Sequence, residues 1–412
     1  MSIFLFIFLT DIGSIIPVEN QSEFTPRGIQ DHFMALKTPV KQGGNTSSKA
    51  GQTKANPGTQ MKQGKVQAQT TASGKSIFDA IPISLVLYLA KPYLAGETKE
   101  EALAIAHALY QENKYSSTLD ILGEDACQDS DCDASVQHYK ELIKLIADKP
   151  LALPESEARR QPTVSFKPSM FATKAPSVGM VRSAELDKAY NRIETLVVFA
   201  EGLGVRVTLE AEDHRWTDFH LETYFSLIES GYKNVGTVIQ TRLFRTQKDL
   251  QRFDERMRTR VVIGIYNEPG TIAHTEKPIM KDLLVKYSRE LLARGTYVEV
   301  ATHDTQCLAN FFAATVTDRV EPHRFETQYL QGVPRKRFQQ ALVSGQLFAG
   351  EEYKKVQEAQ QFLANLAEQG VLVRMYLPFG EGKVAGAYCR RRLKENPNMI
   401  TYGIKNLLKL DS

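Results

Sequence analysis

From Gln161 onward, short apolar segments alternate with longer segments in which apolar residues recur at helical spacing. The short segments have the length and composition of buried strands, and the longer ones have the period of amphipathic helices. Strands are expected at Thr163–Lys167, Val205–Glu210, Val235–Gln240, Arg260–Tyr266, Tyr297–Ala301, Phe325–Tyr329 and Val371–Tyr376. Helices are expected at Ala184–Glu201, Phe219–Ser230, Thr246–Met257, Pro278–Arg294, Thr305–Thr315 and Glu352–Gln369. Such an alternation predicts parallel strands with helices packed outside them.

The number of strands favours a closed barrel over an open sheet. Seven strands can be recognised, and we expect an eighth that the pattern does not locate. No glycine fingerprint of the dinucleotide-binding type follows a strand, and Gly202-Leu-Gly204 is better explained as a helix end. We therefore predict an α/β fold, a (β/α)8 barrel preceded by a small helical region.

The chain before the barrel divides into two parts. From Phe24 to Lys75 the chain is acid-poor and rich in Lys, Gln, Gly, Ser and Thr, and residues 1–75 are predicted to be a disordered, low-complexity basic tail. Its apolar run, Ile3 to Leu9, is too short to span a bilayer and lacks the basic region of a signal peptide. Residues 76–155 predict a helical region, with helices at Ile81–Leu94, Thr98–Glu112 and Asp133–Ala147. The barrel is expected over residues 156–412.

Composition excludes several kinds of protein. An apolar content of 42% supports a substantial core, and a net charge of +3 is too small to indicate a nucleic-acid partner. Four cysteines do not form a disulfide framework, and Cys127 and Cys132 have no second pair of ligands at the spacing of a zinc site. We therefore predict reduced thiols and no metal site.

Polar residues gather at the ends of the expected strands. In a barrel of this kind the active site lies at the C-terminal ends of the strands. The residues found there are Lys167, Glu210, Glu212, Gln240, Tyr266, His303, Asp304, Gln328 and Tyr376. Each residue alone could have a purely structural role, such as a surface lysine or a hydrogen-bonded histidine. Because polar residues occur at the same end of seven strands, we predict a site at this end of the barrel.

A second candidate feature lies near the C-terminus. Tyr388, Arg391, Arg392 and Glu395 have the spacing of one helix face. Two adjacent guanidinium groups suit a carboxylate or a phosphate. The preceding Tyr376-Leu-Pro-Phe-Gly380 is typical of a strand that turns into this helix. The pattern predicts either a pocket for a small acidic metabolite or a solvated basic helix.

Together these segments resemble the proline dehydrogenase family, which are flavoenzymes built on a distorted (β/α)8 barrel. The resemblance covers roughly Ser76 to Leu408 and is densest from Arg260 onward. It is carried by Val164–Lys167, Leu209–Asp213, Val238–Gln240, Arg260–Tyr266, Ala301–Asp304, Phe325–Leu330, Tyr376–Gly380 and Tyr388–Pro397. Ala301-Thr-His-Asp304 and the terminal segment are the most specific members of the series.

The resemblance implies roles for named residues. Lys167, Arg391 and Arg392 would bind the carboxylate of L-proline. The pyrrolidine ring would be enclosed by Tyr266, Leu330, Tyr376 and Tyr388. FAD would be held by Glu210, Gln240, Arg260, Val262, Gly264, Thr302, His303, Gln328 and Glu395.

The resemblance also implies a reaction. L-Proline would be oxidised to Δ1-pyrroline-5-carboxylate, with hydride passing to FAD and electrons then passing to a membrane quinone. A quinone acceptor implies a peripheral membrane association, which the basic tail would assist. We expect the protein in the cytoplasm or peripherally on the inner membrane, or in the mitochondrion of a eukaryote.

Three residues depart from the family pattern. Ile263 stands where the family usually has lysine, Glu210 where aspartate is usual, and Arg242 where an aromatic residue is common. Loss of a cation at Ile263 would alter the flavin potential or weaken flavin binding. Alternatives therefore stay open: a hydroxyproline dehydrogenase, a barrel that binds proline without turnover, or a flavin barrel that acts on another amine or a folate. The bulk of Tyr376 argues against hydroxyproline.

Overall fold

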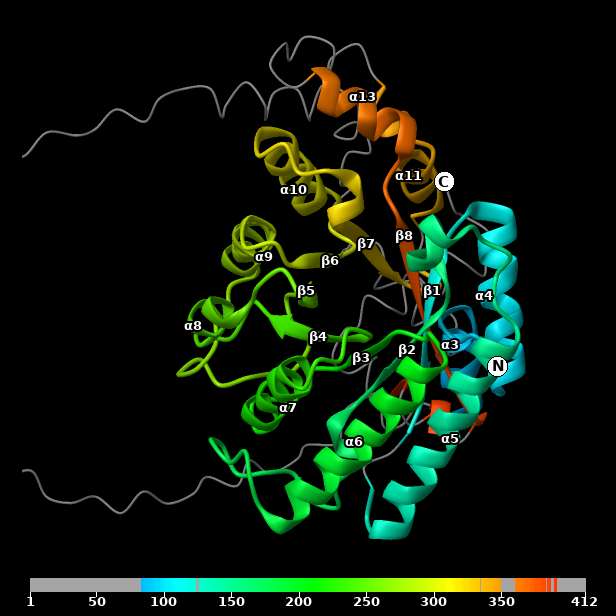
Figure 1. Cartoon of the computed structure of the whole chain (residues 1–412), viewed down its shortest axis with the longest axis vertical. Helices are drawn as coiled ribbons and strands as arrows, with labels where there is room; N and C mark the ends of the chain where they lie inside the picture. The colour runs from blue at the N-terminus through cyan, green and yellow to red at the C-terminus, as the bar shows by residue number, and fades with distance from the viewer. Residues whose placement is uncertain are drawn as a thin grey trace, which may run out of the picture.

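A closed barrel of eight parallel strands forms the centre of the molecule (Figure 1). The computed structural model describes residues 83–123, 126–333, 335–349, 360–382, 384–386 and 389–390. The strands are β1 Ser116–Ile121, β2 Thr163–Phe166, β3 Val207–Leu209, β4 Val235–Gln240, β5 Arg258–Val262, β6 Tyr297–Ala301, β7 Phe325–Leu330 and β8 Val373–Phe379. Each pairs in parallel with its neighbour in sequence, and β1 pairs with β8 to close the barrel. The predicted fold class is confirmed.

Helices surround the strands on the outside of the barrel (Figure 1). They are α3 Ile83–Ala90, α4 Lys99–Asn113, α5 Asp129–Asp148, α6 Ala184–Gly202, α7 Thr217–Glu229, α8 Thr246–Asp249, α9 Lys277–Ala293, α10 Thr305–Thr317, α11 Lys336–Val343 and α13 Gln360–Gln369. Neighbours along the chain pack together, such as α5 with α6 and α9 with α10. The expected helix at Thr246–Met257 is shorter, because α8 changes to a 3-10 turn at Leu250–Arg252. Among the described helices, none is long and apolar enough to cross a membrane.

The strand that the sequence pattern does not locate is β1. Four of its six residues are polar, Ser-Ser-Thr-Leu-Asp-Ile, yet five of the six are buried. Two of the polar side chains find partners across the barrel: the Thr118 and Thr163 hydroxyls lie 2.8 Å apart, and Asp120 accepts from Lys167. Burial is therefore achieved without the apolar run that identifies a buried strand from sequence. The barrel begins at Ser116 instead of residue 156, inside the segment predicted to be helical.

Capping residues fix where several helices begin. Thr98 accepts from the backbone of Glu101 at 3.2 Å, and the Glu101 carboxylate accepts from the backbone of Glu97 and Thr98, which forms a capping box before α4. The Ser183 side chain caps α6 in the same way, and Asp304 caps α10 at the end of β6. Each cap contributes about 1 kcal/mol to helix stability. The Asp304 cap also fixes the chain next to His303.

Below the C-terminal mouth, the barrel interior at β6, β7 and β8 is filled by ion pairs rather than by apolar side chains. Arg374, which is 2% exposed, donates from Nε to Glu326 Oε1 at 2.6 Å. Gln328 donates from Nε2 to Glu326 at 2.7 Å and to Glu299 at 2.8 Å. Burial alone would raise the pKa of Glu326, but Arg374 and Arg206 lower it below its usual range. Removing one member of such a buried pair costs about 3–5 kcal/mol, so this network holds the floor of the site rigidly.

Candidate functional site

Side chains from most of the strands meet at the C-terminal end of the barrel. The candidate residues lie within strands β1 to β8 or directly after them: Asp120, Lys167, Glu210, Gln240, Arg260, His303, Gln328 and Tyr376. All but Asp120 were predicted from the sequence. Their roles toward a substrate or cofactor stay predictions, but the structure brings a group of them into direct contact.

Arg260 is the centre of this group. It is 4% exposed and donates from Nη1 to Glu210 Oε1 at 2.5 Å and from Nε to Gln328 Oε1 at 2.5 Å. Its guanidinium carbon also lies 5.2 Å from the centre of the Tyr376 ring, a cation–π contact. Arg260 on β5, Gln328 on β7, Tyr376 on β8 and Glu210, just after β3, are thereby fixed relative to one another.

The charge of Arg260 is permanent. Burial alone would lower its pKa, but Glu210 and Glu299 raise it above its usual range. Its Nη2 atom is buried and has no hydrogen-bond partner among the described residues. An unsatisfied buried donor costs about 1–3 kcal/mol, and more when it is charged. Such a donor at a barrel mouth is accounted for if a ligand accepts from it.

Lys167 is paired with Asp120, a residue that the sequence analysis did not identify. The ammonium donates to both carboxylate oxygens, at 2.8 and 3.0 Å, and Asp120 is 1% exposed. Burial raises the pKa of Asp120, against the opposing effect of Lys167 and of the Tyr376 hydroxyl. No signal in the sequence points to Asp120, because its position inside the barrel depends on β1, which the pattern does not reveal.

His303 presents a second donor without a partner. Leu330 donates from its backbone nitrogen to Nε2 of His303 at 3.3 Å, so the ring proton is assigned to Nδ1. Nδ1 is buried and has no partner among the described residues. Burial, with a smaller contribution from Arg335, lowers the pKa of His303 to about 4. The imidazole is therefore neutral near pH 7 and donates one hydrogen bond in one direction.

Gly264 is required by its contact with Gln240. The glycine has φ of +97°, and a Cβ there would lie 2.5 Å from Gln240 Oε1. Gln240 donates from Nε2 to the backbone oxygen of Glu212 at 2.7 Å, and no described residue donates to Oε1. The carboxamide oxygen is thus held as a hydrogen-bond acceptor next to the Gly264 backbone. Glu212 is fixed in turn by Ser169, at 2.8 Å from the backbone and 2.7 Å from the hydroxyl.

The remaining predicted residues are placed less tightly. Val262, Thr302 and Leu330 are half-buried at or just beyond strand ends, and Thr302 accepts from the backbone of Asp304 at 3.1 Å. Tyr266 follows β5 by four residues and lies in the loop, not in the strand as expected. Tyr388, Arg391, Arg392 and Glu395 lie outside the described residues.

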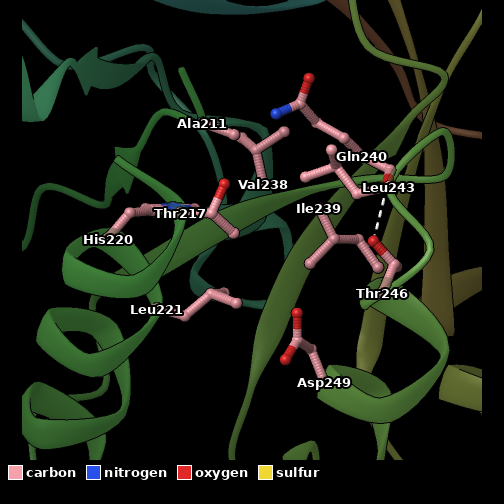
Figure 2. A pocket seen from close by; sticks show the side chains of 10 residues that line it. All are labelled: Ala211, Thr217, His220, Leu221, Val238, Ile239, Gln240, Leu243, Thr246 and Asp249. Carbon is pink, nitrogen blue, oxygen red and sulfur yellow. Dashed lines mark hydrogen bonds between the residues drawn. The ribbon is translucent and has the colours of Figure 1, made fainter. Parts of the chain in front are cut away.

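A small cavity lies beside this site, on the helix side of β4. Figure 2 shows its lining from α7, α8 and β4, with the Gln240 carboxamide directed away from Asp249. Its buried histidine, His220, is satisfied by Thr237 Oγ1 at 2.7 Å and by the Leu209 oxygen at 3.2 Å. Burial lowers the pKa of His220 to about 4. Both contacts are made by Nε2, and the neutral ring supports the wall of the barrel by joining α7 to β3 and β4.

Comparison with known proteins agrees with the resemblance. Residues 103–265 match the family model of proline dehydrogenase. Proline dehydrogenase from Deinococcus radiodurans is 28% identical over 324 residues, which cover 78% of this chain and 90% of that protein. Proline dehydrogenase 1 from Bacillus subtilis strain 168 is 25% identical over 324 residues, with 78% and 91% covered.

Solved structures show the same fold. Proline utilization A from Bdellovibrio bacteriovorus, inactivated by N-propargylglycine, matches with a TM-score of 0.60 and 21% identity over 76% of this chain. A variant of proline utilization A from Bradyrhizobium japonicum matches with a TM-score of 0.58 and 20% identity over 75% of this chain. The chain spans 33% and 31% of the length of these two proteins.

Proposed function

Because the chain belongs to the proline dehydrogenase family, we propose that it oxidises L-proline to Δ1-pyrroline-5-carboxylate with FAD as the immediate electron acceptor. The observation that carries the proposal is the buried Nη2 atom of Arg260, a permanently charged donor without a partner among the described residues. It lies at the C-terminal mouth of the barrel, where enzymes of this fold hold their reactants.

The residues at the mouth suit a flavin. The isoalloxazine ring carries hydrogen-bond acceptors and one N–H donor along its edge. Arg260 Nη2 and His303 Nδ1 supply donors, and Gln240 Oε1 supplies an acceptor. Gly264 provides the space that a Cβ would fill. Gln328 and Glu210 would hold Arg260 in place, with Val262, Thr302 and Glu395 as further contacts. A bound flavin would supply the acceptor for the two electrons that proline loses.

The substrate side of the site is formed by Tyr376 and the Lys167–Asp120 pair. The Tyr376 ring, fixed against Arg260, supplies an apolar wall suited to the saturated ring of proline. Its hydroxyl accepts from Ser165 at 3.3 Å, which limits rotation of the ring. Arg391 and Arg392 would bind the proline carboxylate together with Lys167, and Tyr266, Leu330 and Tyr388 would complete the enclosure. Positioning of this kind, and not acid–base chemistry, would be the main contribution of the protein.

Proline, the flavin and solvent together account for every atom and electron of the proposed reaction. The C–H bond at the ring carbon next to nitrogen breaks, and its hydrogen leaves with the electron pair for the acceptor. The nitrogen lone pair forms the C=N bond, and the N–H proton goes to solvent. Neutral His303 does not compete for this proton near pH 7, because its pKa is about 4.

We propose that a quinone accepts the electrons in turn, at a membrane surface that the chain visits peripherally. The proposal follows from the family resemblance, and the lysine-rich composition of residues 1–75 supports attraction to anionic lipid. Location in the cytoplasm or on the inner membrane, or in the mitochondrion of a eukaryote, follows from the same resemblance. The proposed quinone acceptor is tested by asking whether the FAD-loaded protein reduces a soluble ubiquinone analogue in the presence of proline. Failure to reduce the analogue would contradict this part of the proposal.

A comparison of two substrates tests the substrate class. We expect turnover of L-proline to exceed that of trans-4-hydroxy-L-proline, because Tyr376 stands where a ring hydroxyl would need room. The product is measured with o-aminobenzaldehyde, which reacts with cyclic imines. Preference for hydroxyproline would make the protein a hydroxyproline dehydrogenase instead.

A further inference from the structure

Arg242 is a cation at the barrel mouth that forms no ion pair within the described part of the chain. It lies two residues beyond Gln240, and its Nε atom is buried without a hydrogen-bond partner. Three other cations of the described residues near the mouth are paired: Arg260 with Glu210, Lys167 with Asp120, and Arg245 with Asp249. Glu268, the carboxylate that opposes the lowering of the Arg242 pKa by burial, accepts from the backbone of His214 at 2.9 Å and bonds the His214 ring at 2.5 Å.

The backbone holds Arg242 next to the residues that would contact the flavin. Its nitrogen donates to the oxygen of Ile263 at 3.2 Å, which extends the pairing of β4 with β5 past the strand ends. A Cβ on Gly264 would lie 3.2 Å from Arg242 Cδ and 2.5 Å from Gln240 Oε1. The Arg242 stem and the Gln240 carboxamide therefore lie over the same glycine.

Ile263, the residue before Gly264, does not take part. It is half-buried and packs against the hydrophobic core. Arg242 lies in the turn that follows β4, and its side chain is placed beside the Gln240 carboxamide by their shared approach to Gly264. The structure thus presents a hydrogen-bond acceptor, Gln240 Oε1, beside a charged donor, Arg242.

We propose that Arg242 binds the pyrimidine edge of the flavin ring beside Gln240 and attracts the negative charge that the ring gains on reduction. The inference rests on the proposed function. The pyrimidine edge has an N–H flanked by carbonyl oxygens, which suits an acceptor with a cation next to it. A diphosphate would suit the pair less well, because its oxygens would face Gln240 Oε1 as well as Arg242. Burial lowers the pKa of Arg242, and Glu268 opposes this, so the guanidinium stays charged.

The test uses the full chain loaded with FAD and measures two quantities, the two-electron midpoint potential and the dissociation constant of oxidised FAD. Arg242→Gln should weaken binding of reduced flavin about tenfold more than binding of oxidised flavin, which lowers the potential by about 30 mV. Arg242→Lys keeps the positive charge, so its midpoint potential should stay close to that of the unsubstituted protein. Arg256→Gln is the matched control, because Arg256 is exposed before β5, at the other end of the barrel, and should leave both quantities unchanged.

Arg242→Met, which keeps an apolar stem over Gly264, provides a second variant if the glutamine variant fails to fold, as judged by circular dichroism. A potential equal to that of the unsubstituted protein would overturn the proposal. So would a loss of affinity for oxidised FAD with no shift in potential, because that result assigns the cation to the diphosphate. If the unsubstituted protein takes up no flavin, the proposed function itself fails, and the role of Arg242 fails with it.

Discussion

The ammonium of Lys167 lies 2.8 Å from Oδ2 of Asp120, across the first two strands of the barrel. The partner is almost completely buried and the lysine largely so. The pair therefore holds the Lys167 ammonium at a defined place beside Tyr376. Asp120 bonds Lys167 and the Tyr376 hydroxyl, both predicted to contact the substrate. Substitution of Asp120 is therefore expected to affect the substrate side of the site.

Asp120→Asn should raise KM for proline about tenfold, since Lys167 loses the charge that positions it, with the dissociation constant of FAD unchanged. A factor of ten corresponds to about 1.4 kcal/mol. The effect should vanish when Lys167 is already replaced by Met, because the two residues act as a pair. Steady-state kinetics of the two single variants and the double variant measure this. Additive effects would show that Asp120 acts on the site by another route.

Gly264→Ala should weaken FAD binding. The new Cβ would displace the Gln240 carboxamide oxygen, and the positive φ adds strain of about 1–3 kcal/mol. Gly231→Ala is the matched control, because Gly231 has φ of +94° but nothing within 4 Å of a Cβ. Both variants should lose similar thermal stability, and only the first should lose flavin affinity in a fluorescence titration. Equal loss of affinity would assign the effect to backbone strain alone.

Arg391→Met should weaken proline binding by about 2–5 kcal/mol, because a desolvated carboxylate loses one of its guanidinium partners. The prediction comes from the sequence, since Arg391 lies outside the described residues. KM for proline is the readout, and Arg256→Met is the control at an exposed position. An unchanged KM would refute the predicted carboxylate site.

His303→Asn should flatten the dependence of stability on pH. The folded-state pKa of about 4 lies below the ordinary value of 6.5, so between these values the unfolded chain binds a proton that the folded chain does not. Stability therefore falls as pH falls from 6.5 to 4, by up to about 1.4 kcal/mol per pH unit for this group. Urea unfolding at several pH values measures the slope. The same slope in the variant, or an equal change in the exposed control His138→Asn, would contradict the burial argument.

The sequence predicts much of the barrel because most of its strands are apolar. β4 and β6 begin and end where expected, at Val235–Gln240 and Tyr297–Ala301. β1 is missed because its buried side chains are largely polar, and the partners of Thr118 and Asp120 are known only when the barrel is closed. The same reason hides Asp120, which is 47 residues from Lys167 along the chain.

The sequence predicts which residues form the candidate site, but not which of them contact one another. Strand ends identify Glu210 and Gln328, since the fold places its site at that end of the barrel, and the family resemblance identifies Arg260. That Arg260 bonds the other two and retains one donor depends on side-chain directions across β3, β5 and β7. The position of Arg242 beside Gln240 likewise follows from the close approach of two loops, which no local pattern indicates.

The most direct measurement is an anaerobic titration of the FAD-loaded protein with L-proline while the flavin absorbance near 450 nm, the usual oxidised band of a flavin, is recorded. The account predicts that the band disappears with proline, and that the product reacts as Δ1-pyrroline-5-carboxylate. Protein that holds FAD but keeps the full oxidised spectrum at saturating proline would contradict the proposed function.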